Sequence, residues 1–124
     1  MITPSLLQQA ITFREVMDQP LNTSDENVHE LQATLINEEY KEWRDAFEDE
    51  LSVPKVDQLK ELADLVFVCY QYAAARGWNL DVAMRRVFES NMSKLGEDGK
   101  PIRREDGKIL KGPNYYEPEL IDLV

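Results

Sequence analysis

Four acidic side chains are arranged in two pairs, and in each pair the residues are three positions apart. Glu39 and Glu42 form the first pair, and Glu61 and Asp64 form the second. Residues three apart share one face of an α-helix, so each pair would present two carboxylates together. Hard divalent cations such as Mg²⁺ are bound by oxygen ligands of this kind. Two pairs on neighbouring helices could therefore form a metal site, although an acidic pair on a helix more often belongs to a solvated surface.

Asp64 is the acid that most needs an explanation, because it lies between Ala63 and Leu65 in the most hydrophobic segment of the chain. A buried, unpaired carboxylate costs several kcal/mol even after relaxation. A salt bridge to Lys or Arg, protonation of the carboxylate, or a bound metal ion could each offset this cost. Glu61 lies one turn earlier and Lys60 is nearby. The second acid on that face favours a metal over a simple ion pair.

Other polar side chains could complete a site for phosphate groups. Glu38 could be a further metal ligand, could activate a water molecule, or could be an ordinary solvated helix residue. Asn91 and Lys94 come at the end of an expected helix, and Lys108 and Lys111 follow in a glycine-containing, basic segment. The compact charge of lysine suits phosphate. A lysine near a helix C-terminus can instead simply favour the helix dipole, and Lys94 fits that reading too.

Several other side chains have a structural and a functional interpretation. Phe13 and Tyr115 could stack on a nucleobase, although aromatic residues more often pack in a core or an interface. His29 is the only histidine and lies in an acidic, polar segment, so we expect an exposed residue. Cys69 is expected to behave as a small core hydrophobe.

Four helices are expected to position these residues. Their apolar spacing and turn residues place them at about 4–17, 25–50, 54–76 and 80–94. Candidate N-caps are Thr3, Ser24 and Ser52, and Gly77 suits the left-handed position after the third helix. The third helix is apolar almost all round, which indicates a central, buried helix. Inward-facing residues are predicted on the second helix and the fourth helix: Val28, Leu31, Leu35, Ile36, Trp43, Phe47, Val82, Met84, Val87, Phe88 and Met92.

The remainder of the chain, after Leu95, is rich in Gly, Pro and charge. It is expected to form an ordered basic loop with a short hairpin around Asp106 and Gly107. The fold class is therefore all-α, a four-helix core with an ordered C-terminal loop.

Length and charge limit the classes of protein that fit. The 124 residues suit one domain, 1–124, and no apolar run approaches the ~20 residues that cross a bilayer. The start of the chain does not resemble a signal peptide and the chain has a single cysteine, so a cytoplasmic protein is expected. The net charge of −10 argues against stable nucleic-acid binding.

The charge is unevenly distributed along the chain. Residues 25–50 hold ten acidic side chains against two basic ones, and residues 85–111 hold eight basic against five acidic. One segment suits cations and the other suits anions, and a metal-assisted phosphate enzyme needs both.

These residues resemble a known family, the all-α nucleoside triphosphate pyrophosphohydrolases. This MazG-like group includes dimeric dUTPases, phosphoribosyl-ATP pyrophosphohydrolase and small phage or bacterial members. Its pattern of Glu-x-x-Glu followed by Glu-x-x-Asp is matched by residues 39–42 and 61–64. The run ELADLVFVCY is similar to the third helix of the family, and NMSKLGEDGKPIRREDGKILKGPNYYEPEL is similar to the tail of a small single-domain subgroup. The resemblance covers roughly residues 28–120.

The resemblance implies a mechanism and an assembly. Mg²⁺, for which Mn²⁺ can substitute, would be bound by the four acids and would polarise the α-phosphorus. Water oriented by Glu38 would attack there, Glu39 would also be catalytic, and a homodimer, or a tetramer of two dimers, would be the assembly. The leaving pyrophosphate would be held by Lys94, Lys108 or Lys111. The expected residues for substrate binding are Asn91, Lys94, Lys108, Lys111, Tyr115 and Phe13.

The substrate is expected to be a purine nucleoside triphosphate, dGTP or GTP, because the chain resembles a compact phage-type member. A phage enzyme would act in the host cytoplasm. An alternative is a dUTP pyrophosphatase of the same fold. Phosphoribosyl-ATP is expected less, because an enzyme of that kind would not need the long basic tail.

An alternative of another class is an acidic helical adaptor without catalysis, which would bind a basic partner through the second helix. It rests on the net charge of −10. Neutralising Asp25, Glu48 or Asp49 would then impair the protein more than Asp64→Asn.

Overall fold

The computed structural model describes residues 2–124, which form four α-helices, one small hairpin and one short 3₁₀ helix. The chain divides into two compact units between Asn79 and Leu80. The first unit holds α1 (Leu6–Val16), α2 (Glu26–Glu48) and α3 (Lys55–Arg76), and the second begins with α4 (Leu80–Met92). The expected all-α class is confirmed. No helix in the described part of the chain is long and apolar enough to cross a membrane.

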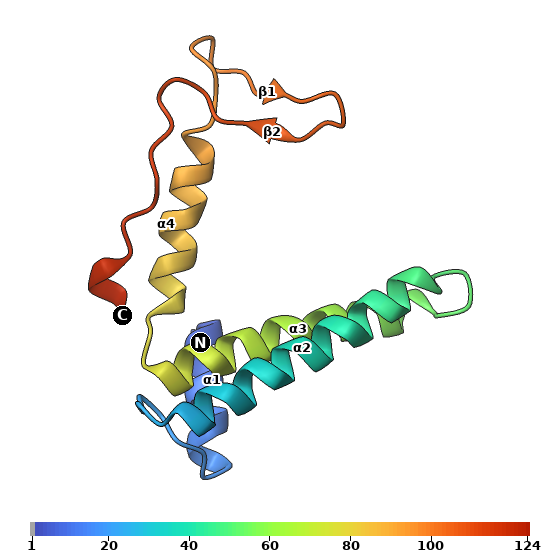
Figure 1. Ribbon diagram of the computed structural model, residues 1–124, viewed down its shortest axis with the longest axis vertical. Helices are drawn as coiled ribbons and strands as arrows, with labels where there is room; N and C mark the ends of the chain where they lie inside the picture. Colours follow the sequence, from blue (N-terminus) through green and yellow to red (C-terminus); the bar gives the residue numbers. More distant parts are fainter. Residues whose placement is uncertain (1) are drawn as a thin grey trace. The chain divides into compact units, whose positions relative to one another are not determined.

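In the first unit, α2 and α3 form an antiparallel pair that lies side by side along most of its length, and α1 packs against α3 (Figure 1). The connection between α2 and α3 is short, which favours antiparallel neighbours. This pairing brings the middle of α2, with Glu39 and Glu42, to the first half of α3, with Glu61 and Asp64.

The helices begin slightly later than the sequence predicts. α1 is capped by Ser5 rather than Thr3, because Ser5 and Gln8 form a capping box. α2 is capped by Asp25 rather than Ser24, since the Asp25 carboxylate accepts a hydrogen bond from the backbone N–H of Asn27.

The third and fourth helices also differ from the expected bounds. α3 follows Pro54 without a side-chain cap, so the prediction for Ser52 is wrong. Gly77 ends α3 with φ of 76°, as predicted, and α4 ends at Met92, before Lys94.

The buried residues of the first unit are mostly small or polar, and most of them come from α1 and the second half of α3. The buried set is Ala10, Arg14, Gln32, Ala46, Tyr70, Gln71, Ala73, Ala74 and Ala75. The expectation of a central, buried helix is wrong for part of α3, because an apolar face along its first half and its middle is exposed. That face includes Leu59, Leu62, Val66 and Phe67.

Some residues expected to face inward on α2 and α4 are also exposed. Apolar spacing identifies a face that tends to be covered, but it does not identify the segment that covers it. The exposed residues of this set are Leu31, Phe47, Met84, Phe88 and Met92.

The second unit contains the predicted hairpin. β1 (Ile102–Arg103) pairs antiparallel with β2 (Ile109–Leu110), and Ile102 lies opposite Leu110. Gly107 adopts φ of 89° in the turn. The final segment runs back beside α4 and ends in the short 3₁₀ helix η1 (Ile121–Leu123), which contacts α4 (Figure 1).

Candidate metal centre

Three acidic side chains converge between α2 and α3. One carboxylate oxygen from each of Glu39, Glu61 and Asp64 lies within 4.8 Å of the other two. Glu39 comes from α2, and Glu61 and Asp64 come from one turn of α3. The packing of the two helices therefore gathers like charges at one point.

Two oxygens in this cluster are buried and have no hydrogen-bond partner among residues 2–124. They are Oε2 of Glu39 and Oε2 of Glu61. Buried polar atoms nearly always have a partner, so two orphaned carboxylate oxygens in one cluster need an explanation. A bound divalent cation would satisfy both of them, and oxygen is the ligand that Mg²⁺ and Mn²⁺ accept.

Burial and crowding both perturb these acids. Burial, followed by the neighbouring Glu42 carboxylate, raises the pKa of Glu39 above its ordinary value. Burial also raises the pKa of Glu61, although the ammonium of Lys60 opposes this shift. Desolvation and nearby negative charge both disfavour the ionised form of a carboxyl group. The negative charge of the cluster is therefore only partly compensated by nearby positive charge.

Asp64 is less buried than the sequence suggests, and it has a partner. Its side chain is 37% exposed, and Lys60 Nζ lies 2.8 Å from Asp64 Oδ2 in an ion pair one turn apart on α3. Lys60 Nζ is also 3.8 Å from Glu61 Oε1. A salt bridge to a basic residue was one of the alternatives that the sequence left open for Asp64, and the expected burial of this side chain is only partial. Its carboxylate still faces Glu39 and Glu61, because one oxygen can join the cluster.

Glu42 and Glu38 have different positions relative to the cluster. Glu42 is exposed and lies outside the group of three, but its carboxylate interacts with those of Glu39 and Glu61. Glu38 is exposed on α2. Glu42 could join the three acids around a cation, and the roles predicted for Glu38 and Glu42 stay predictions.

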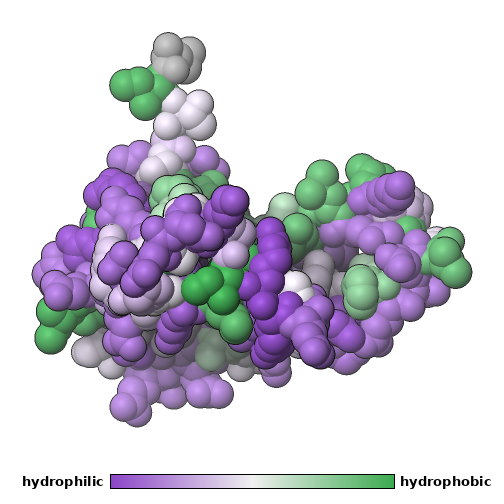
Figure 2. All heavy atoms as spheres, turned by 90° about the horizontal axis from the view of Figure 1, so that it is seen from above, coloured by the Kyte–Doolittle hydropathy of each residue, from purple (hydrophilic) through white to green (hydrophobic). Residues whose placement is uncertain are grey.

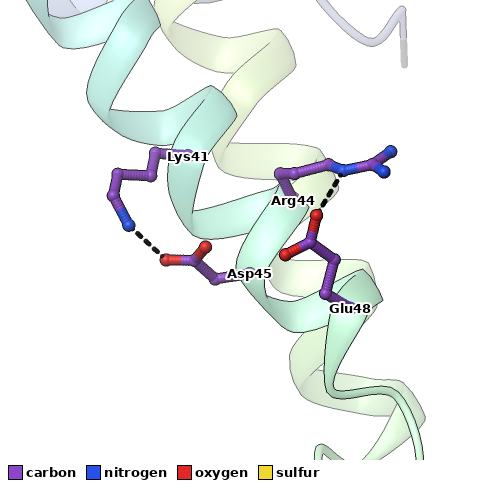
Figure 3. Close-up of polar contacts among 4 residues, drawn as sticks. All are labelled: Lys41, Arg44, Asp45 and Glu48. Carbon is purple, nitrogen blue, oxygen red and sulfur yellow. Dashed lines mark hydrogen bonds and ion pairs between the residues drawn. The ribbon is translucent and has the colours of Figure 1, made fainter.

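The nearby basic residues of α2 are paired elsewhere. Lys41 donates to Asp45 at 2.7 Å, and Arg44 donates to Glu48 at 2.9 Å (Figure 3). Both pairs follow the spacing of one helical turn and lie on the exposed surface of α2. Within the described part of the chain, Lys60 is the basic side chain with an ion pair to the cluster. The acids outnumber that single cation.

The sequence of residues 7–91 matches the family model for phosphoribosyl-ATP pyrophosphohydrolase. The chain belongs to this family. The family is part of the MazG-like nucleoside triphosphate pyrophosphohydrolase superfamily, which confirms the resemblance stated above. A comparison with curated proteins gives no match.

Family membership indicates that the chain is a nucleotide pyrophosphohydrolase, and the matched region contains the whole acidic cluster. The match ends at Asn91, so the basic segment that follows α4 lies outside it. The fold shared with the family therefore accounts for the acids, and the tail is a feature of this chain that the match does not cover.

The predicted substrate-binding residues are divided between the two units. Phe13 lies in the first unit and packs edge-to-face on Phe67, with ring centroids 5.3 Å apart. Asn91 ends the matched region on α4, and Lys94 follows that helix. In the second unit, two of the predicted residues contact each other, because Lys111 Nζ lies 4.7 Å from the centre of the Tyr115 ring. Lys108 is exposed beside the hairpin turn. The contact with nucleotide predicted for each of them stays a prediction.

A further pair of polar residues, which the sequence does not reveal, joins the start of α2 to the end of α3. His29 was expected to be exposed, but it is partly buried, and its Nε2 lies 2.7 Å from the carbonyl of Thr23. Its Nδ1 lies 2.9 Å from Arg76 Nη1, and the guanidinium of Arg76 lies over the Trp78 ring. These side chains line a hollow of about 750 Å³. None of the acids of the cluster lines this hollow, so its large volume does not identify it as the metal site.

Proposed function

We propose that this protein is a divalent-cation-dependent hydrolase that converts a nucleoside triphosphate, dGTP or GTP first, to the monophosphate and pyrophosphate. The observation that carries the proposal is the convergence of Glu39, Glu61 and Asp64 within 4.8 Å, with two buried oxygens that lack a partner. Family membership supports the class of reaction. It also favours an enzyme over an acidic adaptor.

The carboxylates would hold the cation, Mg²⁺ or Mn²⁺, with Glu42 as the fourth acid. The bound cation would neutralise the triphosphate and make a water molecule more acidic. Glu38 would accept a proton from the attacking water and orient it toward the α-phosphorus. The new bond forms between the water oxygen and that phosphorus, and the bond between the α-phosphorus and the bridging oxygen breaks. Positioning and charge stabilisation contribute most of the catalysis in such a reaction.

The basic side chains of the second unit would bind the leaving group. Pyrophosphate carries several negative charges, and Lys94, Lys108 and Lys111 offer compact positive charge. Asn91 would donate a hydrogen bond to a phosphate oxygen. Tyr115 and Phe13 would contact the base.

The choice between a nucleoside triphosphate and phosphoribosyl-ATP rests on the tail. The family model that matches carries the name of phosphoribosyl-ATP, and that match favours phosphoribosyl-ATP as a second candidate substrate. The basic segment after Asn91 lies outside the matched region, which supports a substrate that differs from that of the family's namesake. Among nucleoside triphosphates, dUTP is the alternative to dGTP and GTP.

The exposed apolar face of α3 supports a homodimer. Leu59, Leu62, Val66 and Phe67, together with Leu6 of α1, line an apolar hollow of about 420 Å³. Hydrophobic patches also interrupt the hydrophilic surface in Figure 2. Contiguous exposed apolar surface typically marks an interface. A second copy of the chain would cover this face, and two dimers could form a tetramer. A cytoplasmic location would suit an enzyme that acts on nucleoside triphosphates.

The experiment is a panel of nucleotides incubated with the purified protein and Mg²⁺, with the products separated by chromatography. The panel contains dGTP, GTP, dUTP, the remaining common nucleoside triphosphates and phosphoribosyl-ATP. We expect dGMP or GMP and pyrophosphate to form fastest. Release of a nucleoside diphosphate and orthophosphate would contradict the proposed bond cleavage, and preferential cleavage of phosphoribosyl-ATP would replace the proposed substrate.

A further inference from the structure

The segment that follows the hairpin is attached at three levels to α4 and to the residues just after it. We call residues 112–122 the strap. Figure 1 shows it as the last stretch of the chain, which runs beside α4 in the opposite direction. Its attachments all lie within the second unit, and none of them involves a residue of the acidic cluster.

The first attachment is a close approach of two backbones. A Cβ atom at Gly112 would lie 2.2 Å from the carbonyl oxygen of Leu95 and 2.7 Å from that of Lys94. Only a residue without a side chain fits so close to another backbone. Gly112 therefore places its neighbour Lys111 next to the segment that carries Lys94, just past the end of α4.

The second attachment is made by two serine hydroxyls. Ser90 is 2% exposed, and its Oγ donates to the carbonyl of Tyr116 at 2.7 Å. The backbone N–H of Tyr116 donates to Ser93 Oγ at 3.1 Å, and Ser93 Oγ donates to the carbonyl of Ser90 at 2.5 Å. Both backbone groups of Tyr116 are thus held by α4 or the residue just after it. This fixes the register of the strap.

The third attachment is an ion pair with two parallel hydrogen bonds. Arg86 Nη1 donates to Asp122 Oδ1 at 2.6 Å, and Nη2 donates to Asp122 Oδ2 at 3.1 Å. Nη1 also donates to the carbonyl of Glu119 at 2.9 Å. Paired hydrogen bonds between a guanidinium and a carboxylate add directional specificity to the charge attraction. The hydrogen bond from Arg86 lowers the pKa of Asp122, so this pair stays ionised at neutral pH.

We propose that Arg86 is a positioning residue, which anchors the strap along α4 and thereby holds Lys111 beside Lys94 as one binding group for pyrophosphate. This inference rests on the proposed function, because pyrophosphate is the leaving group of that reaction. Two contacts tie the position of Lys111 to that of the strap. Lys111 directly precedes Gly112 in the chain, and its ammonium lies over the ring of Tyr115. Arg86 itself does not touch the substrate.

The test compares three variants with the wild-type protein. Arg86→Met removes the ion pair to the strap, and Gly112→Ala prevents the close approach at its other end. Arg85→Met is the matched control, because Arg85 is the exposed neighbour of Arg86 and its side chain makes no ion pair within residues 2–124. Hydrogen exchange reports the order of residues 112–122, calorimetry with Mg²⁺ and inorganic pyrophosphate reports binding, and steady-state kinetics reports KM and kcat.

We expect faster exchange in the strap of Arg86→Met and of Gly112→Ala. Each should weaken pyrophosphate binding and raise KM by about tenfold, with kcat changed by less than about threefold, because phosphate contacts made before the reaction act mainly on KM. Arg85→Met should match the wild type. Circular dichroism shows whether each variant folds. If either Arg86→Met or Gly112→Ala does not fold, the remaining one of the two is used to test the proposal.

Two results would overturn the positioning role. One is an exchange rate in the strap that Arg86→Met does not change. The other is a loosened strap with unchanged KM and pyrophosphate affinity. The two proposals can also fail separately. A wild-type protein that hydrolyses no nucleotide, but binds pyrophosphate more tightly than Arg86→Met, contradicts the proposed function alone. A wild-type protein that binds no pyrophosphate overturns the role of Arg86.

Discussion

Glu39 and Glu61 each have a buried oxygen without a hydrogen-bond donor in the described part of the chain, and both lie beside further carboxylates. Such an arrangement opposes folding, because like charges and lost hydration both disfavour the ionised groups. Proteins retain arrangements of this kind where function requires them. Stability and activity should therefore respond in opposite directions when these acids are neutralised.

Replacement of Asp64 by Asn tests whether the acids perform catalysis. We expect Asp64→Asn to lower kcat/KM by at least about 100-fold, because the transition state loses charge stabilisation, while the fold stays intact. Asp45→Asn is the matched control, since Lys41 and Asp45 form the same one-turn ion pair on α2 as Lys60 and Asp64 form on α3. Nucleotide turnover by both variants is the measurement. Equal activity in the two variants would contradict a special role for Asp64.

The pH dependence of stability tests the perturbed pKa values. The folded state has raised pKa values for Glu39 and Glu61, so it holds protons that the unfolded state has already released. In metal-free protein, their contribution to the free energy of unfolding should therefore fall as pH rises above about 4.3 and through the raised values.

Urea unfolding of wild type and Glu61→Gln between about pH 5 and about pH 8 isolates this effect from the other carboxylates. Glu61→Gln should gain stability relative to the wild type as pH rises. Saturating Mn²⁺ should stabilise the wild type and remove the gain of the variant. A difference between the two proteins that does not depend on pH would contradict the shift assigned to Glu61.

Spacing alone predicted that two pairs of acids, each pair one turn apart on its helix, could converge. Three of these four acids do so, namely Glu39, Glu61 and Asp64, whereas Glu42 lies outside the group. It did not predict the ion pair between Lys60 and Asp64, since several rotamers of lysine are compatible with the same spacing. The position of His29 was also missed. Its partners, Thr23 and Arg76, become neighbours only when the start of α2 lies beside the end of α3.

At the scale of the helices, α1 is joined to α3 by a buried polar network. Arg14 is 1% exposed, its Nε donates to the carbonyl of Pro20 at 2.8 Å, and its Nη1 donates to Gln71 Oε1 at 3.3 Å. Gln71 Nε2 donates to the carbonyl of Ala10 at 3.4 Å. No carboxylate pairs with Arg14 among residues 2–124, and burial lowers its pKa.

Removal of this arginine should destabilise the first unit. We expect Arg14→Ala to lower the free energy of unfolding by about 3 kcal/mol, because it leaves a cavity and unpaired acceptors at Pro20 and Gln71. Arg85→Ala, at an exposed position, should change it by less than about 0.5 kcal/mol. Urea denaturation followed by circular dichroism measures both. A small effect for Arg14→Ala would show that the network contributes little to the packing of α1.

The existence, order and type of the helices followed from apolar periodicity, and the end of α3 followed from Gly77. The helix starts were less predictable, because neighbouring side chains compete for the same cap. Thr3 and Ser5 both suit α1, and the reciprocal bonds of Gln8 favour Ser5. An ordered C-terminal segment was expected, but its attachment to α4 was not, since the residues that hold it, Arg86 and Ser90, resemble ordinary polar residues of a helix.

At the scale of the whole molecule, the exposed apolar face on α3 has a direct consequence for assembly. We expect the wild type to sediment as a dimer or larger species, and Leu62→Glu to sediment as a monomer, because a charge in the centre of an apolar interface is costly. Leu51→Glu is the control, since Leu51 is fully exposed in the turn after α2 and lies outside this face. Analytical ultracentrifugation is the measurement. A monomeric wild type, or a Leu62→Glu variant that still dimerises, would contradict the proposed interface.

The central claim is that the acids of α2 and α3 together bind a divalent cation. The most direct measurement is calorimetric titration of metal-free protein with Mn²⁺, for the wild type, Glu61→Gln and Asp45→Asn. We expect saturable, stoichiometric binding to the wild type and to Asp45→Asn, and a loss of that binding in Glu61→Gln. Absence of stoichiometric binding to the wild type, or equal binding to Glu61→Gln, would contradict the claim.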